Sequence, residues 1–247
     1  MDLTGVIQVF LLAFLTAVAT GLGALPFIFV KDMTRSWLGA SNAVAAGLML
    51  AASFGLIYEG VDYSLPRVLA GAVIGLLAIV LARRLISDHD HASSFAQMSA
   101  FDARKALLIV GIMTIHSFTE GIGVGVSFGG GPALGLFITL AIAVHNIPEG
   151  LAISLVLVPR GVSWNRAALW SVFSSLPQPL MAVPAFIFVE TFQPLLPYGL
   201  GFAAGAMIWM VFSELMPDAL EETSSNLVAI VTTISIITMI AFQVLIR

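Results

Sequence analysis

Long apolar runs separated by short polar stretches repeat along the whole chain. Eight runs have the roughly 20 mostly apolar residues that a membrane-spanning helix needs. They cover roughly residues 5–30, 37–58, 66–86, 105–128, 133–158, 166–189, 197–217 and 225–246. We therefore predict an all-α integral membrane protein with eight transmembrane helices, forming a single domain over residues 1–247.

Polar segments mark the ends of several runs. The segment after the third run is polar, and we expect a cytoplasmic loop over about residues 87–104. Gly129-Gly130-Gly131-Pro132 predicts a tight turn between the fourth and fifth runs. No lysine or arginine precedes the first run, so we expect a retained membrane helix and not a cleaved secretory leader.

Lysine and arginine fall unevenly on the two sides of the predicted membrane. Loops after the first, third, fifth and seventh runs, with their flanks, hold Lys31, Arg35, Arg83, Arg84, Arg104, Lys105, Arg160 and Arg166. The opposite side holds only Arg67 and Arg247. Because basic residues favour the cytoplasmic side, both termini are expected on the extracytoplasmic side.

Composition narrows the function classes. Of the 247 residues 59% are hydrophobic and 10% are charged, whereas soluble domains average about 25% charged residues. The surroundings are therefore expected to be a lipid bilayer. The chain has no cysteine, which excludes disulfides and thiolate metal sites. It also has no basic patch, so a nucleic-acid partner is not expected.

Two motifs of the same form lie in adjacent apolar runs. His116 to Gly121 and His145 to Gly150 both read His-x-x-x-Glu-Gly. Residues i and i+4 share one face of a helix, so each histidine lies beside the glutamate of its own motif. The tight turn makes the two runs antiparallel neighbours. His116, Glu120, His145 and Glu149 are therefore expected at similar depth, near the middle of the membrane.

Two imidazoles and two carboxylates at this depth predict a site for a divalent cation, because ionisable residues inside membrane helices usually mark function. Nitrogen and oxygen ligands suit Zn²⁺, and less selectively Fe²⁺, Mn²⁺ or Cd²⁺. Pro148 lies inside the second motif and frees the carbonyl group of Val144. That carbonyl is interpreted as a ligand or as an acceptor for an imidazole; a simple kink is the alternative.

A short internal similarity predicts an inverted repeat. Residues 45–50 (Ala-Ala-Gly-Leu-Met-Leu) resemble residues 203–208 (Ala-Ala-Gly-Ala-Met-Ile), and their runs cross the predicted membrane in opposite directions. Inverted repeats around a midplane site are typical of transporters. Runs one to three would then repeat as runs six to eight around the motif hairpin. Small-residue packing of membrane helices also produces such similarity.

At these motifs the sequence resembles the ZIP family of divalent-metal transporters, in particular its GufA-like branch. His145-Asn146-Ile147-Pro148-Glu149-Gly150 is the most specific match, and the segment from His116 to Ser127 resembles the family's fourth-span motif. The resemblance covers essentially the whole chain. It implies a homodimeric transporter, not an enzyme, which moves Zn²⁺ and related ions into the cytoplasm by an elevator-type alternating-access motion.

The resemblance also implies roles for individual residues. The ligands of the primary ion would be His116, Glu120, His145, Asn146 and Glu149. Met49 would supply a thioether near the same site, although a buried methionine is also common core filler. Glu214 resembles an acidic position on the exit path; an interfacial anchor is the alternative.

Three positions depart from the family pattern by lacking a charge where a second ion would bind. Related proteins often have Asn or Asp at Ser117 and Glu at Gln178, and they can have Asp at Asn146. Because neutral side chains do not balance the charge of a cation, we predict one strong metal site in each chain and a weak or absent second site.

Other readings remain open at this point. Asp88, His89, Asp90 and His91 form a loop that suits capture of released ions, or is an ordinary solvated loop. A metal channel uses the same ligands without a large rearrangement. An intramembrane metalloprotease normally needs His-Glu-x-x-His, which the chain lacks. A haem carrier with His116 and His145 as axial ligands would place two carboxylates against the macrocycle.

Overall fold

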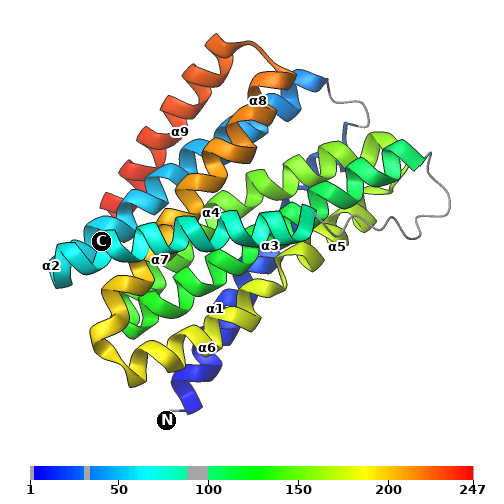
Figure 1. Cartoon of the computed structure of the whole chain (residues 1–247). Coiled ribbons are helices and arrows are strands. Elements are labelled where there is room, and N and C mark those ends of the chain that lie inside the picture. Colours follow the sequence, from blue (N-terminus) through cyan, green and yellow to red (C-terminus); the bar gives the residue numbers. More distant parts are fainter. Residues whose placement is uncertain (1–2, 31–33, 88–99, 247) are drawn as a thin grey trace.

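The computed structural model describes residues 3–30, 34–87 and 100–246, and in these ranges the chain has nine α-helices and no strand (Figure 1). The helices are α1 (Leu3–Leu22), α2 (Arg35–Ser87), α3 (Ala100–Gly129), α4 (Pro132–Leu157), α5 (Trp164–Ser175), α6 (Pro177–Thr191), α7 (Leu196–Met210), α8 (Met216–Glu222) and α9 (Ser225–Leu245). Short 3₁₀ segments η1 (Leu25–Ile28), η2 (Val158–Arg160) and η3 (Gln193–Leu195) and the π-helical turn η4 (Val211–Leu215) join them.

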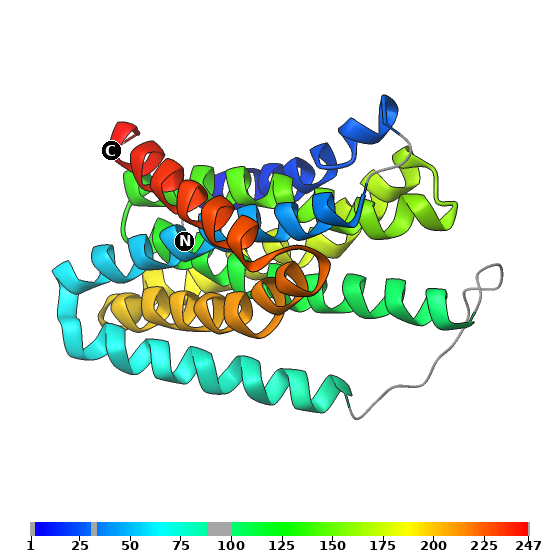
Figure 2. The ribbon, with the colours of Figure 1, turned by 90° about the horizontal axis from the view of Figure 1, so that it is seen from above.

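Helix α2 contains two of the predicted spans. Ser64 leaves helical geometry at φ −174° and ψ 106°, and Pro66 follows inside the same element. Proline has no N–H and crowds the carbonyl of the preceding turn, so the helical hydrogen-bond ladder is interrupted here. The chain doubles back at this point (Figure 2), and the second and third predicted runs are the two limbs of α2.

Two other predicted boundaries differ from the observed ones. Helix α3 begins at Ala100, inside the predicted loop, because charged residues such as Arg104 and Lys105 are good helix formers. The predicted run 166–189 is divided at Leu176 into α5 and α6. Pro177 opens α6, a position where its missing N–H has no helical partner to lose.

The described helices fit a multi-pass integral membrane protein. Six segments are long and apolar enough to cross a membrane, and one of them, Arg35–Leu81, has 47 residues and contains the reversal at Ser64. Helix α3 adds a further helix of 30 residues. The all-helical membrane architecture is confirmed, while the count of eight transmembrane helices stays a prediction.

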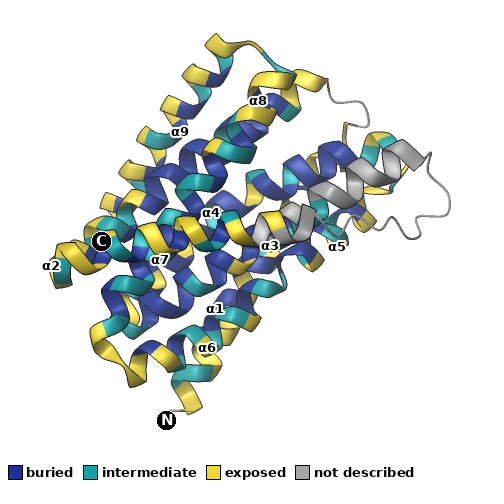
Figure 3. Ribbon diagram, viewed as in Figure 1, coloured by how far each residue is buried: buried dark blue, intermediate teal, exposed yellow. Residues whose placement is uncertain are grey.

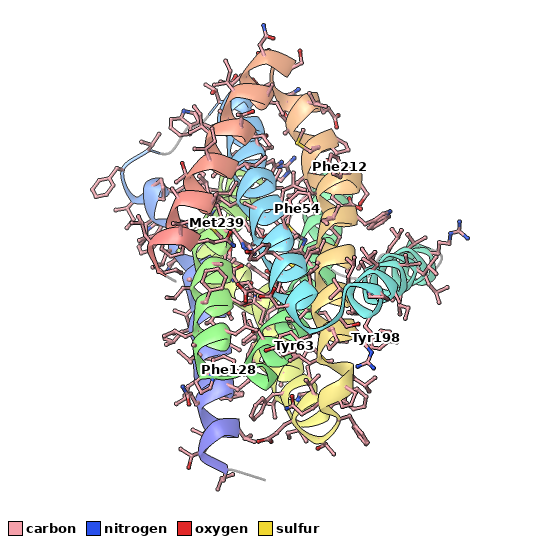
Figure 4. The ribbon with its side chains drawn as sticks, turned by 90° about the vertical axis from the view of Figure 1, so that its left-hand side faces the viewer. Phe54, Tyr63, Phe128, Tyr198, Phe212 and Met239 are labelled. Atoms are coloured by element: carbon pink, nitrogen blue, oxygen red, sulfur yellow. The ribbon has the colours of Figure 1, made fainter. Side chains whose placement is uncertain are left out.

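Many large apolar side chains of the described residues are exposed. Figure 3 shows that buried residues gather on the inward faces of the helices and exposed residues on the outside of the molecule. Phe54 on α2 and Phe212 in η4 are 59% and 61% exposed, and Figure 4 shows both. Helix α4 is the most buried of the six candidate spans. An apolar exterior around a helix bundle is expected where lipid is the solvent.

The helices pack in two groups. The motif bundle contains α1, α3, α4, α5 and α6, and the flanking bundle contains α2, α7, α8 and α9. The two bundles meet where α4 packs on α2 and α3 packs on α7. Both motif helices therefore lie along the boundary between the bundles.

Glycines bring helix backbones into contact inside each bundle. A Cβ atom at Gly150 on α4 would lie 1.6 Å from the carbonyl oxygen of Thr20 on α1. In the flanking bundle, a Cβ atom at Gly205 on α7 would lie 2.1 Å from the carbonyl oxygen of Ala72 on α2. At the boundary, a Cβ atom at Gly123 would meet the side chain of Ala203 at 3.3 Å. Backbones interlock inside the bundles, and side chains meet between them.

Candidate metal centre

The turn between α3 and α4 fixes the two motifs as neighbours. Gly131 has φ +115°, a conformation that other residues rarely adopt, and Pro132 begins α4 immediately after it. The two helices pack against each other in antiparallel fashion. This brings His116 and Glu120 on α3 to His145 and Glu149 on α4, with all four side chains buried.

Each glutamate lies close to the histidine of the other helix. His116 Nε2 is 2.8 Å from Glu149 Oε1, and His145 Nε2 is 2.6 Å from Glu120 Oε1. His116 Nε2 is also 3.5 Å from Glu120 Oε1, so this oxygen lies near both imidazoles. The four side chains thus form one buried polar group across the α3–α4 contact.

Three of these residues have the spacing of metal ligands. Ligand atoms of His116, Glu120 and Glu149 all lie within 4.8 Å of one another, and we call these residues the metal cluster. Two ligands about 2.0–2.1 Å from zinc, at angles of about 90–110°, are roughly 2.9–3.4 Å apart. The 2.8 and 3.5 Å distances from His116 Nε2 to the two carboxylates are close to this range. His145 is outside the cluster and contacts Glu120.

Several buried polar atoms at the cluster have no hydrogen-bond partner among the described residues. His116 Nε2 and Glu149 Oε1 are close, but they are not oriented toward each other as donor and acceptor. Asn146 Oδ1 and His145 Nδ1 also have no partner. Each such atom costs about 1–3 kcal/mol, which a bound cation would offset wherever it coordinates the atom.

Gln178 on α6 joins the cluster to two further helices. Its Nε2 donates to Glu120 Oε2 at 2.5 Å, and its Oε1 accepts from Asn146 Nδ2 at 3.2 Å. The hydroxyl of Thr16 on α1 also contacts Gln178 Oε1. Asn146 Nδ2 donates in addition to the carbonyl oxygen of Thr16 at 2.9 Å. One polar network therefore links α1, α3, α4 and α6.

The other candidate residues occupy different places. Ser117 is buried on α3, and Met49 on α2 is fully buried in the hydrophobic core. Glu214 lies in η4, and its carboxylate has an electrostatic interaction with His116. Asp88, His89, Asp90 and His91 lie outside the described residues.

Pro148 does not divide the second motif. Helix α4 continues through it, and His145 Nδ1 has no hydrogen-bond partner. The His145 imidazole therefore does not donate to the Val144 carbonyl group, while coordination of an ion by that carbonyl stays a prediction.

Sequence reasoning missed Thr16 entirely. A signal was present, because Thr16 and Thr20 are spaced i, i+4 in a mostly apolar run and therefore mark one polar face of α1. The structure buries both, with the Thr20 hydroxyl 2.9 Å from the hydroxyl of Ser175.

Comparison with known proteins agrees with the motifs. The sequence profile of the family described as "ZIP Zinc transporter" matches residues 82–245. A protein of Arabidopsis thaliana, provisionally named a zinc transporter, is 51% identical over 93% of this chain, but the match spans only 37% of that protein. Zinc transporter GufA of Myxococcus xanthus is 34% identical over 83% of this chain and 85% of its own length. Zinc transporter ZIPB of Bordetella bronchiseptica is 33% identical over 81% of this chain and 69% of its own length. The chain therefore belongs to the ZIP zinc transporter family, which is a family of transporters and not of enzymes.

Proposed function

We propose that the protein carries divalent metal ions, principally Zn²⁺, through the membrane by way of the metal cluster. The observation that carries the proposal is the group of buried histidine and glutamate side chains between α3 and α4, where an unpaired carboxylate would be costly. The names of the relatives support zinc as the substrate. Fe²⁺, Mn²⁺ and Cd²⁺ are further substrates in this proposal, with Mn²⁺ and Fe²⁺ bound less tightly than Zn²⁺, as in the general affinity order of divalent metals.

Each residue of the site has a separate task in this proposal. The imidazole of His116 supplies a nitrogen ligand, and Glu120 and Glu149 balance the two positive charges of the ion. The unpaired Oδ1 of Asn146 and the contact between His145 and Glu120 support these two residues as further ligands. Met49 contributes its thioether when the site is loaded.

Transport is proposed to run into the cytoplasm, with both termini and the metal entrance on the extracytoplasmic side. The excess of basic residues in the odd-numbered loops supports this orientation. Glu214 is proposed to bind the ion after it leaves the metal cluster, on the exit path. The electrostatic interaction between Glu214 and His116 supports this role. Asp88 to His91 would then receive ions on the cytoplasmic side.

The proposal includes eight spans in a single domain over residues 1–247, with an inverted repeat of spans one to three and six to eight. Matching glycine contacts support the repeat. A Cβ atom at Gly47 in the second span would lie 2.5 Å from the carbonyl oxygen of Thr232 in α9, the eighth. A Cβ atom at Gly205 in the seventh span would lie 2.1 Å from the carbonyl oxygen of Ala72 in the third span. If span two is exchanged for span seven and span three for span eight, each of these two contacts takes the place of the other, as an inverted repeat requires.

Alternating access is the proposed mechanism, with the motif bundle moving against the flanking bundle. The metal cluster is 0–2% exposed, which favours a carrier over a channel with a continuous open path. Side-chain contacts at the boundary, such as Gly123 with Ala203, are more easily exchanged than the backbone contacts within each bundle. A homodimer belongs to the proposal on the ground of family membership alone.

Uptake of radioactive zinc into proteoliposomes tests this function directly. The wild-type protein should give saturable uptake that unlabelled iron and manganese inhibit less strongly than zinc. His145→Ala and Glu149→Ala should abolish uptake while the protein remains in the membrane, because each removes a buried group of the site. Glu190→Ala, which alters an exposed carboxylate on α6, is the control. Normal uptake by both site variants would remove the motifs from the mechanism.

The stoichiometry of binding gives a second test. Ser117, Asn146 and Gln178 are neutral and buried, so these three positions offer no carboxylate to balance a second ion. Titration of purified protein with zinc should therefore saturate at one tightly bound ion per chain. Two tightly bound ions would contradict this prediction.

A further inference from the structure

Gln178 touches the metal cluster without belonging to it. Its side chain is fully buried on α6, and its Nε2 donates a hydrogen bond of 2.5 Å to Glu120 Oε2. The other oxygen of that carboxylate, Oε1, is the one that lies near the imidazoles of His116 and His145. Glu120 thus has one oxygen engaged by Gln178 and one directed toward the cluster.

The hydrogen bonds around Gln178 fix which end of its amide group meets Glu120. Asn146 Nδ2 donates to Oε1 of Gln178, and the Thr16 hydroxyl contacts the same oxygen. Rotation of the amide by 180° would place its oxygen against a carboxylate and its N–H₂ against the N–H₂ of Asn146. Only the observed orientation satisfies both Glu120 and Asn146.

Backbone packing also limits the movement of Gln178. A Cβ atom at Gly121 would lie 2.4 Å from the carbonyl oxygen of Gln178, so α6 presses on α3 at the residue next to Glu120. Since Glu120 and Gln178 belong to the same interlocked helix pair, the donor has little freedom to leave its acceptor.

We propose that Gln178 determines which divalent ions the site accepts, by holding Glu120 as a ligand with a single oxygen. Zinc favours four ligands in tetrahedral geometry, and a carboxylate binding through one oxygen suits it. Mn²⁺ favours six oxygen-rich ligands, a number that a carboxylate binding through both oxygens helps to reach. Because Oε2 of Glu120 accepts the hydrogen bond from Gln178, this second oxygen is not available to bind the ion. The inference rests on the proposed function, because it assigns a role to Gln178 in the same site.

Gln178→Leu removes the donor and should release Oε2. In purified full-length protein in detergent, calorimetric titration with zinc and with manganese gives the two affinities and their ratio. Zinc affinity should fall by about 10-fold, as is usual when a hydrogen-bond partner of a metal ligand is lost. Manganese affinity should fall less or rise, so the preference for zinc should shrink by at least about fivefold. Gln243→Leu is the matched control, since Gln243 is also buried, but in α9 against Gly55.

The ratio separates a role in selectivity from a merely structural one. Equal losses of zinc and manganese affinity would show that Gln178 only supports the fold, and would overturn the inference while leaving the proposed function intact. If Gln178→Leu does not fold, Gln178→Met provides the same test, because it keeps the length of the side chain and removes the N–H₂ donor. That variant should gain manganese affinity relative to zinc, and an unchanged ratio would again overturn the inference. Absence of zinc binding by the wild-type protein would instead refute the proposed function, and the inference with it.

Discussion

Zinc binding should fall by at least about 100-fold when Glu120 is replaced by glutamine, because this side chain contacts both histidines of the site and Gln178. Its Oε1 lies 2.6 Å from His145 Nε2 and 3.5 Å from His116 Nε2, and its Oε2 accepts from Gln178. In Glu120→Gln, the single amide oxygen would accept the hydrogen bond from Gln178. The new N–H₂ would then face the cluster, so the site would lose both a ligand and a negative charge.

Isothermal titration of the purified variant measures this loss, and zinc uptake into proteoliposomes should disappear with it. Glu190→Gln makes the same chemical change on an exposed side chain of α6 and should bind zinc normally. Size-exclusion chromatography of both variants confirms that they remain folded. Zinc affinity of Glu120→Gln within about threefold of the wild type would exclude Glu120 as a ligand.

Gly150→Ala should cost the largest amount of stability of any single methyl addition to the motif bundle, about 3 kcal/mol. The new Cβ atom would lie 1.6 Å from the carbonyl oxygen of Thr20 and 2.7 Å from its carbonyl carbon. Both are backbone atoms of a packed helix, so α1 and α4 must separate. Glu149 precedes Gly150 directly, and separation of the helices would also displace this carboxylate from His116 and lower the zinc affinity.

Thermal unfolding followed by tryptophan fluorescence compares this variant with Gly111→Ala. Gly111 lies on α3, where a Cβ atom would meet no atom of the described residues within 4 Å. Alanine there should leave stability unchanged or raise it by up to about 1 kcal/mol, because alanine favours helix over glycine. Similar unfolding temperatures for the two variants would mean that α1 and α4 are not in backbone contact at Gly150.

Local pattern predicted the helices and the motif hairpin of this protein because both depend on residues near in sequence. Apolar runs give the spans, and the i, i+4 spacing of His116 with Glu120 gives a shared helix face. Gly131 before Pro132 gives the turn that makes α3 and α4 neighbours. These three facts suffice to bring both motifs to one place.

Contacts between distant segments were beyond the reach of the same reasoning. From the sequence, Gln178 could be recognised only as a neutral residue at a position where relatives often have a charge. Its contact with Glu120 could not be predicted, because this contact depends on how α6 packs on α3. The partner Thr16 lies in a run that hydropathy alone describes as a span. The cross-pairing of His116 with Glu149 and of His145 with Glu120 also follows from the rotation of two helices about their axes, which periodicity leaves undetermined.

Helical phase gives the turn η4 a particular importance. A π-helical turn holds one residue more than an α turn, and each residue of an α-helix advances by about 100°. Leu215 and Ala219 are both buried, so the face that α8 presents to α2 depends on this surplus residue. If this surplus moved along the chain by a few residues, only the residues that it passes would change phase, and α8 would not rotate. Glu214 therefore lies in the part of this span where a carboxylate can be redirected while the helices on either side keep their packing.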